Sequence, residues 1–490
     1  MRIHLRKKLL LACILTGIFV FKVTVFIYGN SQDEPQFTTP PAILVSGGRS
    51  RVHAVKVEPA PLPEGQSRGA VLVARALPSG QLPADEAVRP YLGLRSTWQN
   101  VTYSVGKFFI FSAYFDRRLD KKFVRIIATG RLRLPRTIRA LQCVLHYSDG
   151  SKETVTAEHK VIRENWGLAY TARFVLCNTD RLPLRVSLVE KLDDPNPATV
   201  AVSDLDPSVE RLGDFAVCVK PFHYQFNRAV WLVEFIEFHR LLGVNHFVFY
   251  NHTVGADVQR VLRFYESRGV ATVIQWEMQL RSQKEIRTEN MFAALNDCVY
   301  RSMYRYRYAL LVDVDEYIVP RQHLGYGDMF ELLDSRRRAN YGSFVFKNCF
   351  FYLYWENDTA VAEQLQLSPA GERRFPYLIT LFKTRRMREP FRFFSRSKYF
   401  VAPERAVEVG NHQVWQHVPG FKAMSVGEHY GLVHHYRICE MGGFECKKKP
   451  SVIDRTTHKY LRQLTGQVLT LCAAIFGDSC PEAPPLGSPW

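Results

Sequence analysis

The sequence predicts an α/β protein in which a mainly parallel sheet follows a small β-rich domain and an N-terminal transmembrane helix. From Phe215 onward, strand and helix patterns alternate, which is typical of a parallel sheet covered by helices on both faces. Before that point the chain has short runs of β-branched and aromatic residues without helices between them, which favours an antiparallel β domain. Near the N-terminus, the apolar run from Leu9 to Tyr28 is about the length needed to cross a bilayer as a helix.

The apolar run near the N-terminus also predicts the orientation of the chain. Basic residues precede the run, and none follows it through Pro41, so the positive-inside rule places the N-terminus in the cytosol and the remainder in the lumen. Lys22 lies past the midpoint of the run, where its ammonium can reach the lumenal face. A cleaved signal peptide is the alternative, but the run is long for a signal and lacks a clear cleavage site. We expect an uncleaved signal-anchor.

The composition narrows the class of partners. The chain has 490 residues and a formal net charge of +18, which favours anionic partners such as nucleic acid, acidic lipid or a phosphorylated small molecule. No zinc-finger spacing or RNA-binding aromatic signature accompanies the basic residues, so we expect no nucleic-acid partner. Apart from Cys13 in the apolar run, the cysteines number nine, because the sequence has ten. In an oxidising lumen some should form disulfides, and the odd number leaves at least one free or paired between chains.

Two regions precede the α/β part. Residues 29–89 are rich in proline and glycine with few aromatic residues, which predicts an extended stem. The β-rich domain that follows is expected to support or orient its neighbour. Its predicted strands are Phe108–Tyr114, Phe123–Ala128, Leu141–Tyr147 and Ala172–Leu176.

The α/β part begins near residue 211. Its expected strands are Phe215–Val219, His246–Tyr250, Ala271–Trp276 and Tyr308–Val312, and its expected helices are Ala229–Leu242, Asp257–Arg268 and Gln283–Tyr304. Gly243 is a plausible C-terminal cap of the first helix. The predicted segments of the whole chain are a cytosolic tail 1–8, a signal-anchor 9–28, a stem 29–89, a β-rich domain 90–210, an α/β domain 211–478 and a flexible tail 479–490.

The sharpest chemical signal is the Asp-x-Asp sequence at Asp313 and Asp315, directly after a buried strand. Glu316 follows, so three acids stand in four residues, which is unusual for simple capping of a strand end. Ligands of such sheets bind at the carboxyl ends of the strands, and hard divalent cations prefer carboxylate oxygens. The motif therefore predicts a site where a metal ion grips a nucleotide diphosphate.

Ordered motifs from Trp98 to Arg437 resemble glycosyltransferase family 92. They are Phe111-Ser-Ala-Tyr-Phe-Asp-Arg-Arg, Val217-Cys-Val-Lys-Pro, the segment Trp231–Val244, Ala293-Ala-Leu-Asn-Asp-Cys, Val312-Asp-Val-Asp-Glu-Tyr-Ile-Val-Pro, Arg396-Ser-Lys and His434-His-Tyr-Arg.

The resemblance implies a GT-A-like nucleotide-sugar transferase domain, one Asp-x-Asp metal site, inverting chemistry and UDP-galactose as donor. The nearest likeness is to bird enzymes that add β-1,4-linked galactose to the terminal β-galactoside of N-glycans. With the signal-anchor, it implies a single-pass type II Golgi membrane protein whose partners are a UDP-sugar and a glycoprotein N-glycan.

For the site itself we expect Mn²⁺ to bind Asp315 directly. Asp313 is expected to bind the metal through water or to hold the donor. A late histidine should complete the metal site, with His412 as the first choice and His434 or His435 as the second. Arg396 and Lys398 are candidates for contacting the donor diphosphate as cations.

Inverting transfer also needs a general base on the acceptor hydroxyl. The candidate bases are Glu356, Asp358 and Glu389, and Trp355 could stack on a sugar face. Two rival functions stay open at this stage: a lumenal glycan-binding protein without turnover, and a nucleotide-sugar hydrolase. Three sequons fit a secretory route, of which Asn100 and Asn357 are the expected glycan acceptors, while Asn251 is expected to stay unused.

Overall fold

The computed structural model describes residues 96–104, 106–133, 140–335, 340–366, 375–439, 443–477, 480–482 and 486. The chain divides into two units, residues 1–80 and 81–490, and every described residue lies in the second. The predicted signal-anchor and stem fall outside the described residues, as does most of the predicted tail. Within the described ranges, no helix has both the length and the apolar character that a membrane span requires.

The described chain begins with a nine-stranded sheet of order β5-β4-β8-β9-β2-β3-β7-β6, with β1 paired to β2. Its neighbours are antiparallel except for β2 and β9, which are parallel. A disulfide between Cys143 and Cys177 joins β4 to β7, strands that are distant in this order, so the sheet folds back over its own core. The strands are β1 Gln99–Asn100, β2 Phe109–Asp116, β3 Phe123–Arg131, β4 Gln142–His146, β5 Lys152–Thr156, β6 Glu158–Val161, β7 Tyr170–Asn178, β8 Arg185–Val189 and β9 Ala198–Asp204.

The α/β part is built on a seven-stranded mixed sheet of order β12-β11-β10-β13-β18-β15-β21. The four strands from β12 to β13 are mutually parallel, as the alternating pattern predicts, while β18 runs antiparallel to both of its neighbours. The strands are β10 Gly213–Cys218, β11 His246–Asn251, β12 Ala271–Gln275, β13 Tyr306–Leu311, β15 Tyr341–Phe346, β18 Lys398–Val401 and β21 Lys422–Ser425.

A three-stranded sheet of order β14-β22-β16 continues from the end of β13. Its strands are β14 Glu316–Pro320, β16 Asn348–Tyr352 and β22 Gly431–Arg437. Two short ribbons pair β17 Arg385–Met387 with β23 Ser451–Ile453, and β19 Ala406–Val409 with β20 Val414–His417.

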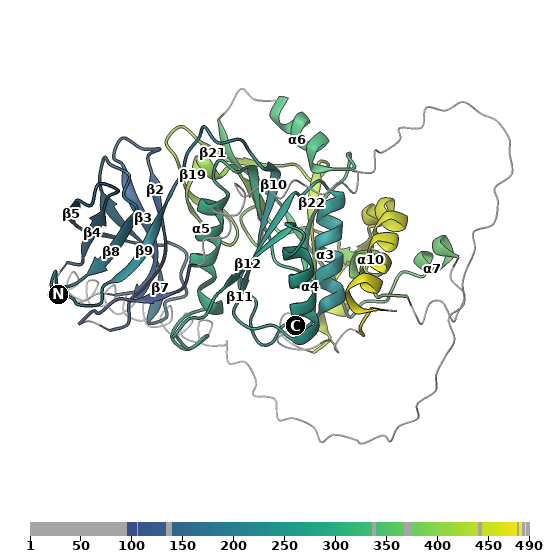
Figure 1. The fold of residues 1–490 in the computed structure, drawn as a ribbon. Helices are drawn as coiled ribbons and strands as arrows, with labels where there is room; N and C mark the ends of the chain where they lie inside the picture. The colour runs from purple at the N-terminus through teal and green to yellow at the C-terminus, as the bar shows by residue number, and fades with distance from the viewer. Residues whose placement is uncertain are drawn as a thin grey trace, which may run out of the picture. The chain divides into compact units, whose positions relative to one another are not determined.

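Helices cover the seven-stranded sheet on both faces (Figure 1). On one face, α3 Ala229–Leu241, α4 Ala256–Glu266 and α10 Leu461–Phe476 share a core with α6 Tyr326–Ser335. On the other face, α5 Met291–Ser302 packs against both the seven-stranded and the nine-stranded sheet. The Cys218–Cys298 disulfide fixes α5 to β10. Two short helices, α7 Ala360–Leu365 and α9 Ile379–Phe382, lie in the later loops.

The predicted helix Gln283–Tyr304 is wrong in its first third, because α5 begins only at Met291. Glu289 and Asn290 have φ angles of 47° and 61°, in the left-handed region that ends a right-handed helix. Tertiary contacts hold this conformation: the Glu289 carbonyl accepts a hydrogen bond from the Trp276 indole at 2.6 Å, and the Asn290 side chain bonds Thr129 of β3. Gly243 does cap α3, with φ of 102° and its N–H bonded to the Arg240 carbonyl.

The cysteine prediction is confirmed for the described residues. Two further disulfides, Cys439–Cys446 and Cys472–Cys480, join those already named, and Cys349 is the free, buried cysteine of this part of the chain. The side chain of Asn251 is buried at the end of β11, whereas Asn100 and Asn357 are exposed. A buried amide cannot carry a glycan in the folded protein, so the burial agrees with an unused sequon at Asn251.

Candidate functional site

The site lies where the direction of the sheet's connections reverses, between the carboxyl ends of β10 and β13. The chain leaves β10 by α3 on one face and returns to β13 by α5 on the other, although the two strands are parallel neighbours. Such a reversal opens a crevice in which α/β proteins bind ligands. Lys220 follows β10 and Asp313 follows β13, and their Nζ and Oδ2 atoms lie 2.7 Å apart. The sheet topology therefore brings a cation and an acid together at this edge.

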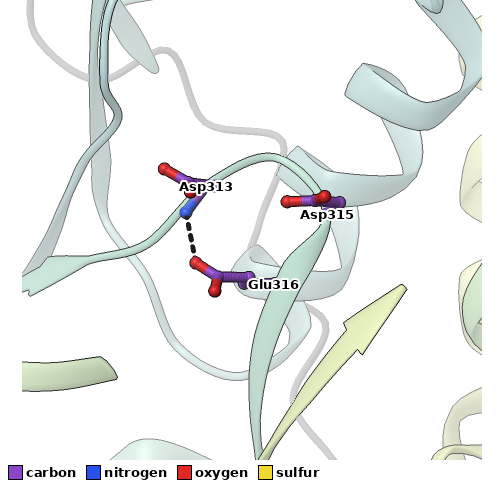
Figure 2. Close-up of side chains that lie close together, drawn as sticks. All are labelled: Asp313, Asp315 and Glu316. Atoms are coloured by element: carbon purple, nitrogen blue, oxygen red, sulfur yellow. Dashed lines mark hydrogen bonds between the residues drawn. The ribbon is translucent and has the colours of Figure 1, made fainter. Parts of the chain in front are cut away.

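Asp313 and Asp315 occupy the turn between β13 and β14 (Figure 2). Burial alone would raise the pKa of Asp313, but the Lys220 and Lys398 ammonium groups outweigh burial and hold that pKa well below its usual range. The pKa of Asp315 is also lowered, because His435 offsets the cost of its burial. Both residues are therefore carboxylates at neutral pH.

Glu316 lies next to these two aspartates, and a carboxylate oxygen of each of the three lies within 4.8 Å of the others. Both oxygens of Glu316 are already engaged. One accepts hydrogen bonds from the Asp313 backbone N–H at 3.0 Å and from the Lys398 ammonium at 2.9 Å, and the other lies 3.1 Å from His435 Nδ1 and accepts from Asn348 at 3.3 Å. Glu316 therefore holds the turn in shape and leaves the two aspartates to face a ligand.

The histidine of the site is His435 on β22. Its ring lies between two carboxylates, with Nδ1 3.1 Å from Glu316 Oε1 and Nε2 3.4 Å from Asp315 Oδ2. A proton on Nε2, or a cation bound between the two atoms, would satisfy this pair of groups. Carboxylate and imidazole together suit Mn²⁺. The donor set of Asp313, Asp315 and His435 therefore fits a divalent cation.

Lys398 is the second cation of the site. Its ammonium is buried, contacts Glu316 at 2.9 Å and Asp313 at 3.6 Å, and donates to Asn411 Oδ1 at 2.9 Å. Burial alone would lower its pKa, but the surrounding carboxylates raise the pKa above its usual range. Arg396, also predicted to contact the diphosphate, has a φ of 61° and places its guanidinium over the rings of Phe350 and Phe391.

The other two candidate histidines have different surroundings. His412 Nδ1 lies 3.1 Å from the Ser397 carbonyl, and its Nε2 lies 3.1 Å from the Asn411 side-chain nitrogen. Burial lowers the pKa of His412 to about 3, helped by Lys398. Because Asn411 occupies the Nε2 lone pair, metal binding by His412 would require that amide to move, and its ligand role stays a prediction. His434 is buried and stacks on Phe351. It precedes His435 on β22, and consecutive residues of a strand point to opposite faces, so His434 points away from the acids.

The three candidate bases have different surroundings. Glu356 and Glu389 are exposed. Asp358 accepts hydrogen bonds from Arg455 at 2.6 and 3.0 Å and from Thr384 at 2.7 Å, and despite partial burial these partners lower its pKa to about 2. A carboxylate stabilised in this way is a weak base, which disfavours the role predicted for Asp358. Trp355 is buried and donates its indole N–H to the Lys447 carbonyl.

Sequence reasoning missed three residues that complete the site. Lys220 stands directly after the Val217-Cys-Val run, and its place at the end of a buried strand was the available signal. Asn411 and Asn348 carried no such signal, because their contacts with Lys398 and Glu316, 13 and 32 positions away, are made only in the folded chain.

Comparison with known proteins places this site in a family. The model of glycosyltransferase family 92 matches residues 213–467, which is more than half of the chain. The chain belongs to glycosyltransferase family 92. The matched region contains all of the acids, cations and histidines described above.

A curated relative is glycosyltransferase family 92 protein F13G3.3 of Caenorhabditis elegans, which is 25% identical over 244 residues. The match spans about half the length of that relative, 46%, and the same share of this chain.

Two solved structures are distantly similar to the chain. TarS of S. aureus, residues 1–349, has a TM-score of 0.26 at 12% identity, covering 46% of this chain and 60% of that one. Glucosyl-3-phosphoglycerate synthase from Mycobacterium tuberculosis, in complex with Mn²⁺, UDP and glucosyl-3-phosphoglycerate, has a TM-score of 0.24 at 12% identity, covering 56% and 81%. Scores this low carry no argument about this chain.

Proposed function

We propose that this family 92 chain is a metal-dependent glycosyltransferase with a GT-A-like catalytic domain that takes its sugar from a nucleotide-sugar donor. One observation carries the proposal: the Asp315 carboxylate and His435 Nε2 lie 3.4 Å apart, beside Asp313, an acid flanked by two lysines. Family membership supplies the reaction class, and this arrangement supplies the means to hold a diphosphate together with its cation.

The chain's own residues divide the work of donor binding. Asp313, Asp315 and His435 would hold a divalent cation, which supplies charge neutralisation for the departing diphosphate when bound. Lys220 and Lys398 contribute positive charge within 3.6 Å of Asp313 Oδ2, and phosphate oxygens accept strong hydrogen bonds from such ammonium groups. Glu316 keeps the turn and the His435 ring in place.

The reaction we propose is inverting transfer. The acceptor hydroxyl oxygen forms a bond to the anomeric carbon of the donor while the bond from that carbon to the diphosphate oxygen breaks, and the hydroxyl proton passes to a carboxylate base. Glu356 and Glu389 are exposed carboxylates that remain candidates for the base. The nucleoside diphosphate is the leaving group.

For the donor and the acceptor we propose UDP-galactose and the terminal β-galactoside of glycoprotein N-glycans, joined by a β-1,4 linkage. The support is the resemblance of the sequence motifs to bird enzymes with that activity. We also propose a single-pass type II protein of the Golgi membrane, supported by the basic residues and the apolar run at the N-terminus.

Transfer by the full chain in detergent micelles tests this function. The protein is incubated with Mn²⁺, each of a panel of UDP-sugars and a galactose-terminated N-glycan, and the products are weighed by mass spectrometry. One hexose added from UDP-galactose, dependent on Mn²⁺ and lost in Asp315→Asn, is the expected result. Asp328→Asn, the same change at an exposed position of α6, is the matched control and should keep full activity.

Two other results would point to the rival functions. Release of UDP without sugar transfer, at the same rate with and without the glycan, would identify a nucleotide-sugar hydrolase. Glycan binding without turnover of any donor would identify a glycan-binding protein. Either result would overturn the transferase proposal.

A further inference from the structure

Trp166 is an exposed aromatic side chain on the surface of the nine-stranded domain. It lies in the loop between β6 and β7 and is 53% exposed, although tryptophan is normally among the better-buried residues because of its large apolar surface. An exposed indole offers a flat apolar face that a ligand can cover.

The loop holds Trp166 in a fixed position. Asn165 accepts a hydrogen bond from the Gly167 N–H at 3.1 Å and donates one to the Arg163 carbonyl at 3.1 Å, so its side chain bridges the backbone before and after Trp166. The Arg287 guanidinium lies 4.7 Å from the centre of the indole ring, a cation–π distance. Arg287 belongs to the segment just before α5. The indole therefore lies in a loop of the nine-stranded domain and contacts a side chain of the α/β part.

The same loop is bonded directly to the candidate donor site. The Glu164 carboxylate accepts hydrogen bonds from the Asn411 backbone N–H and from the Trp415 indole N–H, both at 2.9 Å. Asn411 in turn accepts from Lys398 at 2.9 Å, and Lys398 contacts the acids of the turn. Trp166 stands two positions after Glu164, which is at most about 7 Å of backbone.

Arg287 links Trp166 to the other side of the crevice. Two positions later, the Glu289 carboxylate lies 3.6 Å from His252 Nε2, and His252 follows directly after β11. The Trp166–Arg287 pair is therefore linked, through residues close to each in sequence, to His252 after β11 and to Asn411 in the β19–β20 loop. Asn411 contacts Lys398 at the start of β18, which lies at the same carboxyl edge of the seven-stranded sheet where the donor is proposed to bind.

We propose that Trp166 and Arg287 form a binding platform for the acceptor glycan, supplied by the β-rich domain. The apolar face of a hexose packs on an exposed indole, and a neighbouring guanidinium donates hydrogen bonds to its hydroxyl groups. The ligand class is a neutral oligosaccharide that extends from the transfer site. This inference rests on the proposed transferase function and assigns the β-rich domain a part in acceptor recognition.

The test compares Trp166→Ala and Trp166→Phe with Leu192→Ala in the full chain. Leu192 lies in the β8–β9 loop of the same domain and is 67% exposed, so it controls for loss of exposed apolar surface. For Trp166→Ala we expect the acceptor KM to rise about ten-fold, which corresponds to roughly 1.4 kcal/mol. The donor KM and the rate of donor hydrolysis without acceptor should not change. Trp166→Phe should lie between wild type and Trp166→Ala, and Leu192→Ala should match wild type.

An unchanged acceptor KM in Trp166→Ala would overturn the platform, and so would a rise in donor KM alone. Binding of the same galactose-terminated N-glycan, measured by saturation-transfer NMR on the same preparations, separates this result from failure of the proposed function. If wild type transfers no sugar but binds the glycan, loss of that binding in Trp166→Ala supports the platform. Equal binding by the two proteins, or no glycan binding by wild type, overturns it.

Discussion

Replacing Glu316 with glutamine should damage both the stability and the metal affinity of the protein. Glu316 is 1% exposed and receives the Lys398 ammonium, the Asp313 N–H and the His435 ring. The glutamine amide carries no charge, and its NH₂ group must face at least one of these donors. Removing one partner of a buried ion pair costs about 3–5 kcal/mol. Because Asp313 stays 3.6 Å from the ammonium, we expect the lower end, about 3 kcal/mol.

The assay is denaturant unfolding of the wild type, Glu316→Gln and Glu331→Gln, followed by Mn²⁺ titration of each folded protein. Glu331 is exposed on α6, so the same substitution there should change the free energy of unfolding by no more than about 0.5 kcal/mol. A loss below about 1 kcal/mol in Glu316→Gln, together with unchanged Mn²⁺ affinity, would refute the assignment of Glu316 as the residue that holds the turn.

Three further outcomes follow from the geometry. His435→Ala should weaken Mn²⁺ binding about 100-fold, as expected for removal of a group that faces the metal. His434→Gln, with folding verified by circular dichroism, should leave the Mn²⁺ affinity unchanged. Equal losses of affinity in both variants would contradict the assignment of His435 to the metal site. The folded pKa of Asp358 is about 2, below its usual value of 3.8, so its ion pair should stabilise the protein above pH 4 and lose its effect as the pH falls through 2. Asp358→Asn should therefore be less stable than wild type at pH 7, and most of this difference should be gone at pH 2. A constant difference in the free energy of unfolding across that range would argue against the ion pair. Burial raises the pKa of the Cys349 thiol to about 11, so iodoacetamide at pH 7.5 should leave Cys349 unlabelled in the native protein and label it after unfolding, as read by peptide mass spectrometry.

The parts of the fold that could be predicted are those with local causes. The short apolar runs of β10, β11 and β13 predict strands, and the spacing of apolar residues before Gly243 predicts helix α3 and its end. The Asp-x-Asp turn could also be predicted as a ligand site from the local sequence, because three acids directly after a buried strand need a positively charged partner.

The parts that could not be predicted depend on contacts between distant segments. The false first third of helix Gln283–Tyr304 has residues that accept a helix, and only its contacts with Trp276 and β3 force the left-handed conformation. The choice among the late histidines is of the same kind. Strand alternation shows that His434 and His435 point to opposite faces, but only the pairing of β22 with β14 shows that His435 faces Asp315.

The residues of the site are far apart in the sequence, and this has a consequence for truncated forms of the protein. Its groups come from Lys220, from the turn at 313–316, and from Lys398 and His435. A truncated or alternatively spliced product that ends before residue 435 would keep the recognisable Asp-x-Asp motif but would have no histidine to face it. The Asp-x-Asp motif alone therefore does not show that a gene product has a complete metal site. The presence of β22, which carries His435, is the better criterion.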